Sequence, residues 1–180
     1  MNNYAVFLSP ILAQRLPEGS KKKALSLLAL RKLWHLIFDL APTTVQLLQD
    51  TTRPLNNFLT FAHGKHYSMN WTLHLYLLDW LYHDAEFRQK LKTPIILELM
   101  SAAALRWSVD VMSYPRVKGI LLATSYSEKI VIGCWRSKTA WEETRLIRVS
   151  MPSQYFPVIP AYAISYEYDV WGIPQWNALP

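Results

Sequence analysis

The sequence predicts an α+β fold, with a helical N-terminal part packed on a small C-terminal antiparallel sheet of three to four strands. Up to Asp110, apolar residues recur at three- and four-residue spacings, which is typical of amphipathic helices. After Asp110 the pattern changes to short runs rich in β-branched residues, separated by turn residues. Helices that come first and strands that follow indicate α+β rather than alternating α/β.

The chain length indicates one domain. Its 180 residues are the usual size of a single domain, so we predict one domain over 1–180, helical over 1–110 and strand-rich over 111–180. Apolar residues make up 51% and charged residues 18% of the chain. This composition excludes a disordered chain, which needs low hydrophobicity and high charge.

The first predicted helices are bounded by turn residues and prolines. The turn Pro17–Ser20 precedes a helix over 22–40, and the Ser20 hydroxyl can accept a hydrogen bond from an exposed N–H of the first turn. Pro42 ends this helix and can start a short one, because proline suits a first helical turn. A further short helix is predicted over 55–61.

Two longer helices complete the predicted helical part. The apolar spacing predicts the longest helix over 70–91, with Asn70 as its cap. Pro94 opens another helix that runs through Trp107.

The strand-rich part contains four runs that favour β-structure. The first two are joined by Tyr126–Glu128, which can form a hairpin turn, and the last run alternates polar and apolar residues as a half-exposed strand does. The region 151–160 holds three prolines and is expected to be irregular. The predicted strands are 120–125, 129–136, 144–150 and 161–170.

Several classes of chemistry are disfavoured. The five glycines are too scattered for a phosphate-binding loop or a dinucleotide fingerprint. The single cysteine, Cys134, can form neither an internal disulfide nor a cysteine-rich zinc site, and its apolar surroundings predict a buried residue on a strand. We therefore predict no cofactor and no metal.

The targeting features of the sequence favour a cytoplasmic protein. The N-terminus lacks the basic segment of a signal peptide, and no window offers the roughly 18 apolar residues of a membrane-spanning helix. We expect no membrane association.

An acid–base enzyme is one alternative that the residues allow. Asp79 and His83 are four residues apart, so they share a helical face, and a carboxylate can orient an imidazole for proton transfer. Glu98 lies in an apolar helical stretch, where burial would raise its pKa. Both features are also ordinary on a solvated helix surface, so we expect a binding protein rather than an enzyme.

Positive charge beside aromatic residues predicts nucleic-acid binding. Lys and Arg number 19 and Asp and Glu 13, a net charge of +6. Cations at the start of a helix oppose its dipole, which suggests contact with phosphate, and arginines near aromatic rings suit nucleic acid. The main hypothesis is a small basic nucleic-acid-binding protein, an accessory subunit of a larger nucleoprotein assembly. Its predicted contact residues are Lys21, Lys22, Lys23, Arg31, Lys32, Arg136, Lys138, Arg145 and Arg148.

A protein-interaction subunit or adaptor is the other alternative. The C-terminal segment 170–180 carries Trp171 and Trp176 and no charge after Asp169. Such an apolar segment either packs on its own domain or docks on a protein partner. In the second case, the two tryptophans are the predicted partner-binding residues.

Overall fold

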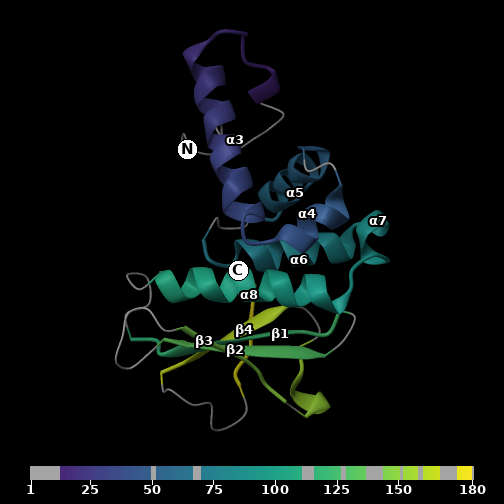
Figure 1. The fold of residues 1–180 in the computed structure, drawn as a ribbon, viewed down its shortest axis with the longest axis vertical. Coiled ribbons are helices and arrows are strands. Elements are labelled where there is room, and N and C mark those ends of the chain that lie inside the picture. Colours follow the sequence, from purple (N-terminus) through teal and green to yellow (C-terminus); the bar gives the residue numbers. More distant parts are fainter. Residues whose placement is uncertain are drawn as a thin grey trace. The chain divides into compact units, whose positions relative to one another are not determined.

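The computed structural model confirms the α+β fold class, with helices followed by an antiparallel sheet (Figure 1). The chain forms two compact units, Met1–Tyr67 and Ser68–Pro180. The single domain over 1–180 remains a prediction. The structure describes residues 13–49, 52–66, 70–110, 116–126, 129–136, 144–150, 152–157, 160–166 and 174–179.

Helix α3, Lys21–Phe38, is the main element of the first unit. As predicted, Ser20 caps it: its hydroxyl oxygen accepts a hydrogen bond from the Lys23 N–H at 3.2 Å. One side of the helix is buried through Leu33 and Ile37, which are four residues apart.

Helices α4, Pro42–Leu48, and α5, Thr52–Gly64, complete the first unit as far as it is described. Pro42 occupies the first turn of α4, where its missing N–H costs nothing. Helix α5 buries Leu55, Phe58 and Leu59, so it contributes a large share of this unit's apolar core.

The predicted helix over 70–91 is wrong in extent, because Asp84 divides it. Helix α6, Leu73–His83, ends at Asp84, whose backbone is extended at φ −76° and ψ 124°. The Asp84 carboxylate accepts hydrogen bonds from the N–H groups of Glu86 at 2.9 Å and Phe87 at 3.4 Å. It thereby starts the short helix α7, Ala85–Arg88. The periodic apolar spacing continues across this cap, which is why it concealed the break.

Helix α8, Thr93–Val109, agrees with the prediction and is the helix that packs on the sheet. Pro94 lies in its first turn. Its buried residues include Ile96, Leu99 and Trp107. Figure 1 shows α8 between α6 and the sheet.

The sheet of the second unit is antiparallel, and its strand order is β3-β2-β1-β4-β5. The predicted hairpin is confirmed, since β1 and β2 pair directly with Leu121 opposite Gly133. The four predicted strands are present. The last of them ends at Ser165 among the described residues, earlier than the predicted 170. A fifth strand of two residues was not predicted. Their bounds are β1, Gly119–Thr124; β2, Ile130–Arg136; β3, Thr144–Arg148; β4, Ala161–Ser165; and β5, Asn177–Ala178.

The two faces of the sheet are covered differently. One face packs on α8, where the Cys134 thiol lies 3.6 Å from the carbonyl oxygen of Ala104. The other face holds a cluster that includes Leu121 and Trp135, and the partly buried Phe156 and Trp176 pack against it. Burial on both faces explains the nearly continuous apolar sequence of β1 and β2.

The indole of Trp135 lies across two glycines of neighbouring strands. A Cβ atom added at Gly133 would come within 2.1 Å of the Trp135 ring, and one at Gly119 within 2.4 Å. Only residues without side chains allow the ring to lie this close to the sheet. The glycines of this sheet therefore form a seat for a tryptophan.

A membrane-spanning helix is absent from the part of the chain that the structure describes.

Candidate functional site

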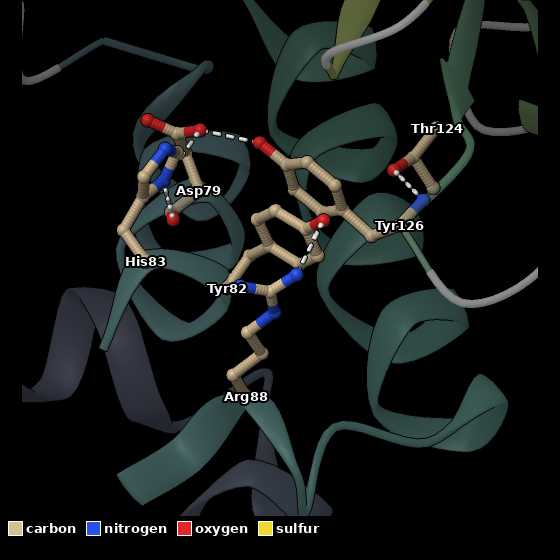
Figure 2. A network of polar contacts seen from close by, with 6 residues as sticks. All are labelled: Asp79, Tyr82, His83, Arg88, Thr124 and Tyr126. Atoms are coloured by element: carbon tan, nitrogen blue, oxygen red, sulfur yellow. Dashed lines mark hydrogen bonds and ion pairs between the residues drawn. The ribbon is translucent and has the colours of Figure 1, made fainter. Parts of the chain in front are cut away.

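The candidate site is a network of polar side chains around helix α6 (Figure 2). Asp79 and His83 share a helical face, as predicted: His83 Nδ1 lies 3.4 Å from Asp79 Oδ1 and 2.8 Å from the backbone oxygen of Asp79. The Asp79 residue is only 8% exposed, whereas more than half of the His83 side chain is open to solvent. The pair thus joins a buried carboxylate to an exposed imidazole.

Tyr126 supplies the partner that sequence reasoning missed. Its phenol donates a hydrogen bond to Asp79 Oδ1 across 47 residues of sequence. The Tyr126 backbone N–H donates to Thr124 Oγ1 at 3.4 Å, so the end of β1 orients the tyrosine. No local pattern connects the hairpin turn to α6, and the packing of both α6 and the sheet on α8 brings them together.

Aromatic stacking extends the network to helix α7. The rings of Tyr82 and Tyr126 are stacked, with centroids 3.7 Å apart and an angle of 5° between their planes. The Arg88 guanidinium lies 4.7 Å from the Tyr82 ring centroid, and its Nη2 donates to Tyr82 Oη at 3.3 Å. Figure 2 shows the two tyrosines between Arg88 and Asp79. Helices α6 and α7 and the β1–β2 turn are held together by these contacts.

The arrangement of this network is that of a structural tie. The Asp79 carboxylate already accepts a hydrogen bond from the Tyr126 phenol and faces His83. A general base must instead direct its free oxygen or nitrogen at a substrate. Glu98, the other residue considered for acid–base work, is half-buried on α8.

The cysteine is buried, as predicted. Burial raises the pKa of the Cys134 thiol to about 12, and the nearby Arg136 only partly opposes this shift. A thiol with such a pKa is protonated at neutral pH and is a poor nucleophile or metal ligand. Within the described residues, His, Cys, Asp and Glu side chains form no group of three that could hold a metal ion.

The first group of predicted basic residues lies on α3 in the first unit. Lys21, Lys22, Arg31 and Lys32 are exposed, whereas Lys23 is partly buried and forms an ion pair with Glu18. This half of the predicted contact surface is thus present as a cationic helix surface.

The second basic group lies in the second unit, and its best-described member has a structural role. Arg136 Nη2 donates to the carbonyl oxygens of Trp107 and Asp110, each at 3.0 Å, and Nη1 donates to that of Val117 at 3.2 Å. Its guanidinium also lies 4.2 Å from the Trp107 ring centroid. Arg136 thereby supplies hydrogen-bond donors to backbone carbonyls at the C-terminal end of α8. Burial lowers its pKa, and Asp110 opposes that shift.

The other members of the second group are described in part or not at all. Arg145 and Arg148 belong to β3, opposite Trp135 and Ile132, and only their backbone is described. Lys138 lies outside the described residues.

The C-terminal segment packs on its own unit as far as it is described. The Trp176 indole N–H donates to the Tyr155 carbonyl oxygen at 2.6 Å, and its ring packs on the cluster around Trp135. Strand β5 then pairs with β4. Trp176 therefore packs on its own unit, which is one of the two alternatives considered for this segment. Trp171 lies outside the described residues.

These features define a class: an α+β protein with a helical unit and a helix-covered antiparallel sheet, in which the side chains of Asp79, Asp84 and Arg136 join structural elements. The chain belongs to the MbnC-like family, because residues 14–180 match the family model described as methanobactin biosynthesis cassette protein MbnC-like. A search of curated proteins found no match.

The family corrects the main functional hypothesis. We expected a nucleic-acid-binding accessory subunit of a nucleoprotein assembly, but a family of biosynthesis cassette proteins indicates a role in making a compound. The nucleic-acid prediction was wrong because net charge attracts many anionic partners and identifies none of them.

Proposed function

We propose that this protein takes part in methanobactin biosynthesis, by binding another protein of the cassette rather than by carrying out the chemistry itself. The observation that carries the biosynthetic role is the family match, which spans residues 14–180 and therefore both compact units. A cassette supplies several proteins for one product, so one of these proteins can contribute by binding another.

The roles of the ionisable side chains support binding over catalysis. The Asp79 carboxylate contacts Tyr126 and His83. The Arg136 guanidinium donates hydrogen bonds to three backbone carbonyls. Cys134 is a buried, protonated thiol. Each group is engaged in holding the second unit together. The chemistry of the pathway is then expected in a partner.

We also propose a cytoplasmic location. It is supported by the lone cysteine, which is a buried thiol, since proteins of reducing compartments keep their cysteines in that form.

The test is genetic complementation in a strain that produces methanobactin and lacks this gene. Methanobactin in the culture is measured by mass spectrometry. The unmodified gene should restore production, and His83→Ala and Glu98→Gln should each restore it to within about twofold, because neither residue performs proton transfer. A catalytic acid or base would contribute about 100-fold or more.

Two results would contradict the proposal in different ways. Full production without the gene would exclude a required role in the pathway. A loss of about 100-fold in His83→Ala or Glu98→Gln, with normal circular dichroism and protein level, would place catalysis in this chain.

A further inference from the structure

Helix α3 exposes leucines on a side that differs from the side of its buried residues. Leu25 is 44% exposed, Leu28 50% and Leu36 42%. With Lys32 they follow spacings of three, four and four residues, so they form one stripe, which we call the leucine–lysine face. Leu33 and Ile37 lie on a different side of the helix, which is buried. Among the described residues, α3 therefore carries apolar side chains on a buried side and also on an exposed one.

The leucine–lysine face is bordered by cations. Lys21 lies one turn before Leu25, and Arg31 and Lys22 flank the stripe. In the part of the chain that the structure describes, these three residues and Lys32 form no ion pair. The lysine side chains carry apolar stems beside the leucines and place their charge at the rim.

The carboxylates closest in sequence are already engaged. Asp39 forms an ion pair with His35 at 3.2 Å, and Glu18 pairs with Lys23. Within the described part of the chain, neither carboxylate forms an ion pair with the cations at the border of the face. The face therefore combines an apolar centre with a positive rim.

We infer that the leucine–lysine face binds an apolar groove bordered by aspartate and glutamate on another protein of the cassette. Amphipathic helices dock into such grooves through side chains at three- and four-residue spacings, and complementary charge at the rim guides association. This inference rests on the proposed function and adds a description of the partner's binding surface. A second copy of the chain is a poor occupant, because it would bring Lys32 and Arg31 close to their own like charges.

The experiment measures binding of the purified full-length chain to each other purified protein of the cassette by isothermal titration calorimetry. The double variant Leu25→Glu/Leu28→Glu should weaken binding about 30-fold or more, because carboxylates would enter an apolar, acidic groove. Lys32→Glu should weaken it about threefold to tenfold and reduce the dependence of the Kd on salt.

Two matched variants serve as controls. Leu105 on α8 is exposed to the same extent as Leu25, at 44%, so Leu105→Glu makes the same chemical change in the other unit. Arg53 is an exposed cation in the first turn of α5, so Arg53→Glu reverses a charge outside the face. Both should bind within about twofold of the unmodified protein, and circular dichroism checks that every variant folds.

The outcomes distinguish a failure of the leucine–lysine face as the binding surface from a failure of the proposed function. Tight binding that the α3 variants leave unchanged would overturn the leucine–lysine face and leave the proposed function standing. No binding to any cassette protein would overturn both. A concentration-dependent dimer, or sedimentation with anionic vesicles, that Leu25→Glu/Leu28→Glu abolishes would assign the face to a second copy or a lipid surface, and would overturn the acidic protein partner.

Discussion

The phenol of Tyr126 donates a hydrogen bond to the carboxylate of Asp79 and so ties the turn of the β1–β2 hairpin to the middle of α6. The same tyrosine stacks on Tyr82, and Arg88 of α7 packs on that ring. One residue in a turn therefore joins the sheet to α6 directly, and to α7 through the ring of Tyr82.

The first prediction tests the tie. Tyr126→Phe keeps the stack on Tyr82 but removes the phenol donor from the poorly exposed Asp79 carboxylate. A hydrogen bond to a charged group contributes about 1.5–3 kcal/mol, so the free energy of unfolding should fall by about that amount. Urea denaturation followed by circular dichroism measures it.

Tyr166→Phe is the control for this substitution. Tyr166 is 63% exposed, so loss of its hydroxyl should change stability by less than about 0.5 kcal/mol. Equal midpoints for the two variants would mean that the Tyr126 hydrogen bond contributes no net stability.

The sequence predicted the fold where local signals decide it. Ser20, Pro42 and Pro94 each mark a helix start, and the structure places helices there. The change of period after Asp110 located the strands. Side-chain periodicity and capping act over a few residues, so they can be read directly from the sequence.

The contacts that decide function could not be predicted in this way. The Tyr126–Asp79 hydrogen bond spans 47 residues and depends on the packing of α6 and the sheet on α8. The exposure of Leu25 and Leu28 is also non-local, because the sequence shows that a helix is apolar but not which of its sides is covered. Net charge likewise identified no partner, and the prediction of nucleic acid from it was wrong.

The second prediction concerns the cap that divides α6 from α7. Asp84→Ala removes the acceptor for the Glu86 and Phe87 N–H groups, and loss of such a cap costs about 1 kcal/mol. Asp84→Asn keeps a side-chain oxygen at the cap and should recover most of this loss. Thermal unfolding of both variants checks the order; equal losses would show that charge, not the cap hydrogen bonds, is responsible.

The third prediction concerns the glycine seat of Trp135. Gly133→Ala places a Cβ atom within 2.1 Å of the indole, which must move out of the cluster with Leu121. Overpacking of this kind costs about 1–3 kcal/mol or more, and the tryptophan fluorescence maximum should shift to longer wavelength as the ring gains water.

Gly64→Ala is the matched control for this substitution. Gly64 lies in α5, and an added Cβ meets nothing within 4 Å there. It should be neutral or stabilising by up to about 1 kcal/mol, because alanine favours a helix. A stable Gly133→Ala protein with unchanged fluorescence would refute the seat.

The last prediction uses the buried thiol. Burial raises the pKa of Cys134 from 9.0 to about 12, so the folded protein holds this proton more tightly than the unfolded chain. Between these two values the unfolded thiol ionises and the folded thiol does not. The unfolded state is then favoured as pH rises, and stability falls by about 1.4 kcal/mol per pH unit for this group. Below about pH 8 the thiol makes no pH-dependent contribution, because it is protonated in both states.

Cys134→Ala isolates that contribution from the tyrosines and lysines, which titrate in the same range. The stability difference between the unmodified protein and the variant should shift by about 1 kcal/mol against the unmodified protein between about pH 9 and 10. A thiol reagent should label the folded protein slowly and the urea-unfolded protein rapidly. Parallel stability profiles together with fast labelling of the folded protein would mean that the thiol is accessible and would contradict its burial.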